Sequence, residues 1–258
     1  MIKAKKSLGQ HFLTDNNIIR KIVHSIAATE EDRVVEIGPG TGAITGFLFE
    51  RFSDFKAIEV DQRAIEVLNE QFPGIELIEQ DVLKIDWAKL SKGKDQTHIV
   101  GNLPYYITSP ILFGLFEART HIKEAIVMMQ KEVAERLVAV HSSKAYGILS
   151  VQTQLMSSVD ILFHVAPGSF SPPPNVDSSV VRLVFDQPEL SCSDHNLKRV
   201  VRTAFNQRRK KLSNALKPIL QDHKPEGFNL DDRAEHWEPR VYEKLTEYLE
   251  KHDILPAS

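Results

Sequence analysis

The feature that most constrains the fold is an alternation of two hydrophobic periods along the first two-thirds of the chain. Short apolar runs alternate with segments whose apolar residues recur at helical spacing. This order predicts an α/β fold with a parallel, doubly wound sheet and right-handed crossovers. We expect strands at 33–37, 55–60, 75–79, 98–101 and 125–129, and helices at 43–51, 62–72 and 109–118.

The remainder of the chain departs from this order in two steps. The extended runs at 159–165 and 178–185 predict an antiparallel pair at one sheet edge. The prolines at 172–174 predict a stiff, exposed loop between them. After Pro188 the apolar residues recur at helical spacing and little resembles a strand. We therefore expect a first domain over 1–187 and a small, all-helical domain over 188–258.

Cysteine usage and hydropathy limit the compartment and the partners. The single cysteine cannot form an intramolecular disulfide, and no Cys/His cluster has metal-ligand spacing, so we expect no metal. A reducing compartment, the cytoplasm, fits best. No apolar run of signal-peptide length follows the basic start, and no stretch approaches the roughly 18 apolar residues of a membrane span. We expect no membrane partner and, without an obvious extra apolar face, a monomer.

A glycine-rich turn follows the first predicted strand. Gly38, Gly40 and Gly42 let the backbone approach a ligand closely, and the next helix offers unpaired N–H groups. A dinucleotide site has the spacing G-x-G-x-x-G, whereas this turn has E-x-G-x-G-x-G. The acid, Glu36, would repel a pyrophosphate. It suits a ligand with an ammonium group, such as the methionine part of S-adenosyl-L-methionine.

Two further acids end the next two predicted strands. Glu59 is placed to accept hydrogen bonds from ribose hydroxyls, and Asp81 from the exocyclic amine of a cofactor adenine. Either acid alone is also typical of a solvated loop. Because the carboxyl ends of parallel strands meet at one sheet edge, these acids and the glycine-rich turn together predict a binding site for S-adenosyl-L-methionine.

The loop after the fourth predicted strand reads GNLPYY over 101–106. An adenine N6 amine is a poor nucleophile because its lone pair is delocalised into the ring. The Asn102 side-chain oxygen and the Pro104 carbonyl can grip both N6 hydrogens, while Tyr105 stacks on the base. Such a site acts by positioning and electrostatics, and a paired adenine must first leave its stack. The alternative is a proline turn with packed tyrosines.

The chain resembles the ribosomal RNA adenine N6-dimethyltransferase family, and more narrowly its small-subunit (16S) branch, nearly from end to end. The matching segments are 8–13 (LGQHFL), 35–42 (VEIGPGTG), 58–61 (IEVD), 80–82 (QDV), 101–106 (GNLPYY), 129–137 (MQKEVAERL), 170–178 (FSPPPNVDS) and 204–212 (AFNQRRKKL). The resemblance implies a Rossmann-like class I methyltransferase sheet over 1–187 that binds S-adenosyl-L-methionine, with a helical RNA-binding domain over 188–258.

The resemblance also implies roles for particular residues. Phe170 matches a family aromatic that faces Tyr105 across the target base, although it is equally well placed to anchor its loop in the core. His11 stands where the family often has Asn, so we expect its contact with the cofactor to use the backbone. The candidate catalytic residues are Asn102, Pro104, Tyr105 and Phe170. The candidate cofactor residues are His11, Leu13, Gly38, Gly40, Glu59, Asp81, Val82 and Asn102.

A net charge of −3 conceals a basic segment. No Asp or Glu occurs over 195–221, and a run of charge there is typical either of a solvated helix face or of contacts with phosphates. A second basic patch, Lys3, Lys5 and Lys6, precedes the cofactor motif and is expected to act as an arm that orders on RNA. The candidate RNA-binding residues are Arg202, Arg208, Arg209, Lys210 and Lys211.

The function implied by the resemblance is transfer of methyl groups to N6 of two adjacent adenines in the 3′-terminal hairpin loop of 16S rRNA, within the small ribosomal subunit or its precursor. One alternative is a large-subunit rRNA adenine methyltransferase, which the long basic helical tail disfavours. A second alternative is a DNA adenine methyltransferase. It is disfavoured because such enzymes often have an acid and two prolines in the loop where residues 102–105 of this chain read NLPY. The third alternative is a ribosome-assembly checkpoint with secondary catalysis.

Overall fold

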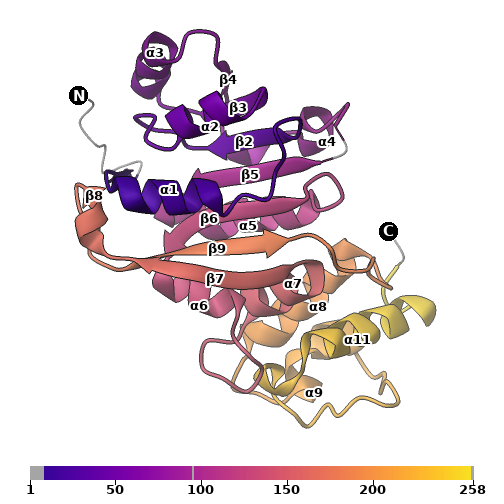
Figure 1. Ribbon diagram of the computed structural model, residues 1–258. Coiled ribbons are helices and arrows are strands. Elements are labelled where there is room, and N and C mark those ends of the chain that lie inside the picture. The colour runs from indigo at the N-terminus through magenta and orange to yellow at the C-terminus, as the bar shows by residue number, and fades with distance from the viewer. Residues whose placement is uncertain (1–8, 95, 257–258) are drawn as a thin grey trace. The chain divides into compact units, whose positions relative to one another are not determined.

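The computed structural model describes residues 9–94 and 96–256, which form two compact units (Figure 1). The first unit consists of the chain up to 134 together with 159–185, and the second of 135–158 together with 186–258. The expected assignment of 1–187 and 188–258 to two domains stays a prediction of domain organisation. The segment 135–158 groups with the helical unit because its helix packs against two later helices.

A seven-stranded sheet forms the first unit, in the order β4-β3-β2-β5-β6-β9-β7. The first five strands in chain order are parallel, β9 is antiparallel to β6, and the arrows of β9 and β7 point in opposite directions (Figure 1). The predicted doubly wound sheet with an antiparallel edge is confirmed. The strands are β2 (Arg33–Ile37), β3 (Asp54–Glu59), β4 (Glu76–Glu79), β5 (Thr97–Asn102), β6 (Glu124–Gln130), β7 (Ser158–Val165) and β9 (Ser178–Val184).

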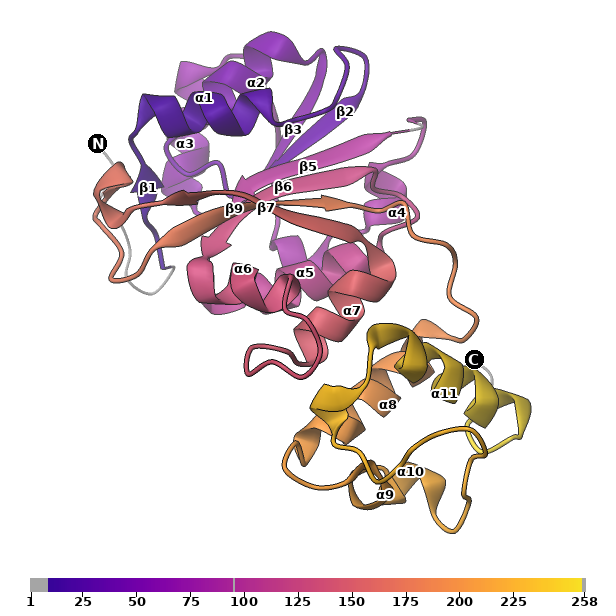
Figure 2. The same ribbon diagram turned by 60° about the horizontal axis from the view of Figure 1, so that its bottom comes forward.

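Helices cover both faces of this sheet (Figure 2). On one face lie α1, α2 and α3, and on the other lies α5. The helices of the unit are α1 (Asn16–His24), α2 (Thr45–Arg51), α3 (Gln62–Gln71), α4 (Trp87–Leu90) and α5 (Thr108–Glu117). The first turn of a further helix, α6, whose full range is Lys131–Leu137, also belongs to it. The short 3-10 turns are η2 (Val82–Lys84), η3 (Tyr105–Ile107) and η4 (Pro167–Ser169).

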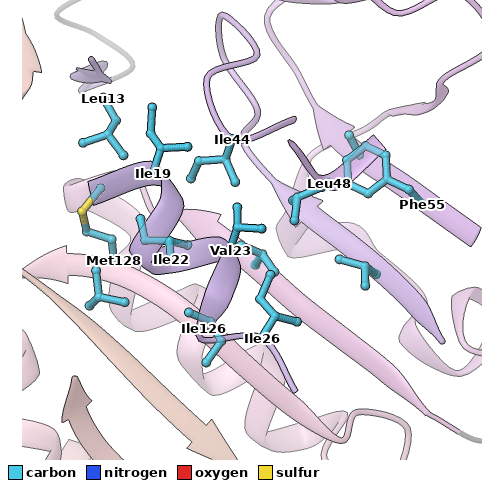
Figure 3. Close-up of a cluster of buried hydrophobic side chains, with 14 of the residues drawn as sticks. Leu13, Ile19, Ile22, Val23, Ile26, Ile44, Leu48, Phe55, Ile126 and Met128 are labelled. Atoms are coloured by element: carbon cyan, nitrogen blue, oxygen red, sulfur yellow. The ribbon is translucent and has the colours of Figure 1, made fainter. Parts of the chain in front are cut away.

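Helix α1 is an element that the sequence pattern did not predict. Its N-terminus is capped by the Asp15 carboxylate, which accepts hydrogen bonds from the amides of Asn17 and Ile18 at 2.9 and 3.3 Å. Its apolar face belongs to a buried cluster that also includes β6 residues such as Ile126 (Figure 3). Burial of that face holds the short helix on the sheet, since an isolated helix of this length is unstable in water.

A two-stranded ribbon joins distant parts of the first unit. Strand β1 (Phe12–Leu13) pairs antiparallel with β8 (Phe170–Ser171), and Leu13 and Phe170 are register partners. The following prolines, Pro172 and Pro173, are exposed as predicted, but Pro174 is buried. The expectation of a wholly exposed loop is therefore wrong for Pro174, whose lack of a backbone N–H makes burial of its ring inexpensive.

The second unit is helical, as predicted. Helices α7, α8 and α11 pack against one another. Aromatic rings fill their core, and two buried hydroxyls are satisfied: Tyr146 donates to the Trp237 carbonyl at 2.8 Å, and Tyr242 to the Ala234 carbonyl at 2.5 Å. The elements are α7 (Ile148–Met156), α8 (Asp194–Asn206), α9 (Leu212–Ala215), α10 (Lys217–Leu220), η5 (Ala234–His236) and α11 (Pro239–Lys251).

A buried charged cluster stabilises the amino edge of the sheet. The Glu124 carboxylate, at the start of β6, accepts hydrogen bonds from His98 Nδ1 at 3.1 Å and from the Ala27 amide at 2.7 Å. The Arg182 Nε lies 3.5 Å from the same carboxylate. Burial by itself raises the pKa of Glu124, but these partners hold that pKa below its ordinary value. The ionised carboxylate therefore stabilises the fold.

We predict that Glu124→Gln lowers the free energy of unfolding at pH 7 by about 2 kcal/mol, because charge-assisted hydrogen bonds of a buried group are lost. A lowered folded-state pKa means that this stability is present above the ordinary carboxyl pKa of 4.5 and is lost as pH falls through the folded-state value. Urea unfolding at pH 7 and pH 3.5 measures both effects. The exposed control Glu50→Gln should match the wild type, and equal stability of Glu124→Gln at pH 7 would contradict the prediction.

Candidate functional site

A cavity of 350 Å³ lies at the carboxyl ends of the parallel strands. Five segments line it: 9–13, 36–41 with 43–44, 58–60, 80–83 and 102–107. All eight candidate cofactor residues and three of the four candidate catalytic residues lie among them. The sequence-based prediction thus selects positions that the fold brings to one cavity, of a size that suits a small-molecule ligand.

The glycine-rich turn needs glycine at Gly40 for two reasons. Its φ is +56°, in the left-handed region that side chains disfavour. A Cβ atom there would also lie 3.0 Å from the ring of Phe12. The N-terminal ribbon therefore packs directly on the backbone of the turn, and Phe12 lines the same cavity.

A second close approach joins the turn to the loop that begins at Asn102. A Cβ atom on Gly101 would lie 2.6 Å from the carbonyl oxygen of Ile37, so only glycine allows β5 to pair with β2 at this register. Ile37 precedes Gly38, and Gly101 precedes Asn102. This contact therefore places the glycine-rich turn beside the Asn102 loop.

The Glu59 carboxylate, at the end of β3, holds the backbone around the cavity. One oxygen accepts a hydrogen bond from the Gly40 amide at 3.2 Å. The other accepts from the amides of Val60 and Asp61 at 2.8 and 2.9 Å. Each carboxylate oxygen has two acceptor sites, so these bonds leave one site, on the oxygen that binds Gly40, for a ribose hydroxyl. Glu59 thus orders the turn as well as lining the cavity.

A second acid, Glu36, gives the cavity wall an unusual electrostatic character. It is buried, and its carboxylate accepts a hydrogen bond from the Thr45 hydroxyl at 2.7 Å. Burial raises the pKa of Glu36 to about 8, and the nearby Glu59 charge adds to the rise although the Thr45 hydrogen bond opposes it. A bound cation would favour the ionised form of Glu36, whereas a bound anion would favour the neutral form.

The far end of the cavity has an apolar rim. Val60 is 62% exposed and Leu83 is 47% exposed, which is unusual for large apolar side chains. Asp81 lies beside them and caps η2 by accepting a hydrogen bond from the Leu83 amide at 3.0 Å. Two apolar side chains next to a carboxylate suit an adenine ring, whose faces are apolar and whose amine donates hydrogen bonds.

The Asn102 loop is fixed at its start and at its end. The Leu103 amide donates to the Met128 carbonyl at 2.9 Å, and Asn102 Nδ2 donates to the His11 carbonyl at 3.0 Å. That orientation leaves Oδ1 as the acceptor end of the amide. The Pro104 carbonyl accepts from the Thr108 hydroxyl at 3.0 Å and keeps a second lone pair. Asn102 and Pro104 both line the cavity.

Tyr105 and Phe170 occupy different environments. Tyr105 lines the cavity, its hydroxyl lies 2.6 Å from the Ser178 hydroxyl, and its ring stacks on His11 with centroids 5.5 Å apart. Burial raises the pKa of the Tyr105 phenol, although its hydrogen bond to Ser178 opposes the rise. Phe170 is buried in the core beside Leu13. A contact of Phe170 with a target base stays a prediction.

The candidate RNA-binding residues in the second unit fall into two groups. Arg208 forms an ion pair with Glu235 at 2.5 Å and donates to the Ser143 carbonyl at 3.1 Å, and Lys211 lies 3.0 Å from Asp231. The exposed residues are Arg202, Arg209 and Lys210, for which the described part of the chain shows no ion pair. The basic patch of Lys3, Lys5 and Lys6 lies outside the described residues.

The part of the chain that the structure describes has neither a metal-binding cluster nor a membrane-spanning helix. No group of three or more His, Cys, Asp or Glu side chains there is arranged to hold a metal ion. No helix among residues 9–94 and 96–256 is long and apolar enough to cross a membrane.

Comparison with known proteins identifies a family. A model of the family described as ribosomal RNA adenine dimethylase matches residues 1–251. A ribosomal RNA small subunit methyltransferase A from Prosthecochloris aestuarii is 45% identical over 244 residues, which cover 95% of this chain and 93% of that protein. A protein of the same name from Salinibacter ruber is 45% identical over 262 residues, covering 98% and 88%.

Solved structures share the fold. A dimethyladenosine transferase from Plasmodium falciparum has a TM-score of 0.78 and 27% identity, covering 94% of this chain and 98% of that chain. The 23S rRNA methyltransferase ErmE has a TM-score of 0.67 and 26% identity, covering 93% and 99%. The predicted Rossmann-like methyltransferase fold with a helical C-terminal region is confirmed.

We predict that Glu59→Gln weakens binding of S-adenosyl-L-methionine on the order of 10- to 100-fold, because a neutral amide accepts weaker hydrogen bonds and loses the charge that favours a cation. Isothermal titration calorimetry measures the change. Glu79→Gln is the matched control, since Glu79 ends β4 as the exposed register partner of Glu59. Equal affinity of Glu59→Gln and the wild type would show that this carboxylate does not support the ligand.

Proposed function

Because the chain belongs to the ribosomal RNA adenine dimethylase family, we propose that it transfers methyl groups from S-adenosyl-L-methionine to N6 of two adjacent adenines in the 3′-terminal hairpin loop of 16S rRNA. The observation that carries this proposal is one shared cavity. Asn102, Pro104 and Tyr105 line it together with the glycine-rich turn and Glu59. Small ribosomal subunits or their precursors are the proposed substrate.

The residues of the cavity fit S-adenosyl-L-methionine. That group supplies a methyl on a positively charged sulfur. The Glu59 charge favours a cationic ligand over an anionic one, and a bound cation would also favour ionisation of Glu36. The backbone of the glycine-rich turn leaves room for the ligand because Gly40 has no side chain. Val60 and Leu83 offer apolar surface to the adenine, with Asp81 beside them.

The Asn102 loop then acts on the target amine by position alone. Asn102 Oδ1 and the Pro104 carbonyl each accept a hydrogen bond from one N6–H group. These two hydrogen bonds favour a geometry in which the lone pair is localised on the nitrogen. Tyr105 offers its ring face to the base and limits its tilt. Fixed acceptors stabilise the charge that develops on nitrogen without reorganisation, and this is the main source of catalysis expected here.

The choice of the small subunit rests on the names of relatives. Proteins named ribosomal RNA small subunit methyltransferase A match at 45% identity over nearly the whole chain, whereas the 23S rRNA methyltransferase ErmE shares 26% identity. Both kinds of relative methylate ribosomal RNA by name. An experiment is therefore needed to distinguish the small-subunit function from the large-subunit alternative and from the assembly checkpoint.

We predict that the wild type transfers label from S-adenosyl-L-methionine to unmethylated small subunits and yields N6-dimethyladenosine, with no label in large subunits or DNA. Asn102→Ala should lower kcat by about 100-fold or more, because one fixed acceptor of the N6 amine is lost. Asn175→Ala, which changes an exposed asparagine outside the cavity, is the control and should be as active as the wild type.

Other outcomes separate the alternatives. Label in large subunits would move the protein to the 23S branch. Absence of label from every substrate would favour a checkpoint without catalysis. Unchanged kcat in Asn102→Ala, with N6-dimethyladenosine still formed, would remove Asn102 from the chemistry.

We further propose that the exposed basic residues of the second unit contact rRNA phosphates. Arg202, Arg209 and Lys210 are exposed, so their charges are available to a partner. Arg208 is held by Glu235 and by a backbone carbonyl, and its first role is structural. Lys211 and Asp231 are both largely exposed, and such a surface pair is weak enough for RNA to displace.

We predict that changing Arg202, Arg209 and Lys210 together to Gln weakens binding to small subunits. The slope of log affinity against log salt concentration should become less steep by about two. Filter binding between 50 and 300 mM KCl measures both. The control neutralises Lys89, Lys92 and Lys123, which are exposed residues of the first unit outside this segment. Equal salt slopes for the two triple variants would contradict a specific role of the basic segment.

A further inference from the structure

The Tyr105 hydroxyl has a partner from a distant part of the chain. It lies 2.6 Å from the hydroxyl of Ser178, 73 residues later, and either oxygen can be the donor. Ser178 is fully buried, and Tyr105 is partly buried at the cavity. Because one of its two hydroxyls is fully buried, this hydrogen bond restrains the position of the phenol.

The sheet fixes the position of Ser178. It is the first residue of β9, whose register partner in β6 is Gln130. The preceding residue, Asp177, accepts a hydrogen bond at its carbonyl from the Lys131 amide at 2.9 Å. Tyr105, in contrast, lies on the single turn η3, outside any strand. The hydrogen bond therefore ties a loop residue to a rigid strand.

The other restraint on the Tyr105 ring comes from His11. The two rings are stacked, with centroids 5.5 Å apart and an interplanar angle of 26°. His11 is itself held, because its Nδ1 donates to the Pro172 carbonyl at 2.8 Å and its own carbonyl accepts from Asn102. Stacking restrains the tilt of the Tyr105 ring but not its rotation within the ring plane. The hydrogen bond to Ser178 supplies that missing restraint.

We propose that Ser178 is a positioning residue for methyl transfer, whose hydroxyl fixes the Tyr105 ring in the orientation that receives the target adenine. The inference rests on the proposed function. Ser178 is not among the residues that line the cavity, so it acts through Tyr105. Misplacement of a stacking surface by a fraction of an ångström changes the geometry of attack at N6, so loss of the hydroxyl is expected to lower kcat about tenfold.

The test compares two buried serines on the same strand. Ser179 follows Ser178, is equally buried, and has its hydroxyl 2.8 Å from His164 Nδ1, while adjacent strand residues point to opposite faces. Ser178→Ala should lower kcat about tenfold, with Kd for S-adenosyl-L-methionine unchanged. Ser179→Ala should lose similar stability in thermal unfolding and keep kcat within about twofold of the wild type.

A double variant adds a readout that a loss of stability alone would not produce. Tyr105→Phe removes the same hydrogen bond from the other side. The double variant removes both hydroxyls, so no buried hydroxyl is left without a partner. Its kcat should therefore be no lower than that of the worse single variant. In ¹³C NMR of ring-labelled tyrosine, the Tyr105 signal should shift in Ser178→Ala and stay unchanged in Ser179→Ala.

Three results would overturn the positioning role: wild-type kcat in Ser178→Ala, equal losses of kcat in the two serine variants, or fully additive losses in the double variant. A wild-type protein that methylates no rRNA would overturn the proposed function and the positioning role together. An active wild type with an equally active Ser178→Ala variant would overturn the positioning role alone.

Discussion

The close approach of β5 to β2 at Gly101 is the constraint on which the rest of the site depends. With no side chain at this position, the strand can lie against the Ile37 carbonyl, where a Cβ atom would be 2.6 Å away. The glycine-rich turn starts at the end of one strand and the Asn102 loop at the end of the other. The turn proposed to hold the methyl donor and the loop proposed to hold the target amine therefore line one cavity.

Most of the sheet could be predicted because its strands and helices repeat two clear periods over short distances in sequence. The residues that line the cavity could be predicted as well, since a parallel sheet brings the ends of successive strands to one edge. Glu59 shows the limit of such reasoning. Its position at the end of β3 could be predicted from the sequence. Its hydrogen bonds to the Gly40, Val60 and Asp61 amides could not, because they depend on the folded backbone.

The features that the sequence did not reveal all depend on partners far apart in the chain. The strands of the β1–β8 ribbon have two residues each, too few to show a period. Arg208, a predicted RNA contact, also forms an ion pair with Glu235, and no local pattern indicates this pairing. Ser178 reads as an ordinary strand residue until β9 takes its place beside β6. The role of a polar residue such as Arg208 or Ser178 therefore depends on neighbours that only the tertiary fold brings close.

The position of β9 has a consequence for the order in which the enzyme becomes competent during its own synthesis. The strand inserts between β6 and β7, so the sheet cannot be completed in the order in which the chain leaves the ribosome. The glycine-rich turn and the Asn102 loop emerge early, but the hydroxyl that restrains Tyr105 is made 73 residues later. A nascent chain therefore has the residues proposed to bind the cofactor before Tyr105, the proposed surface for the target base, is restrained.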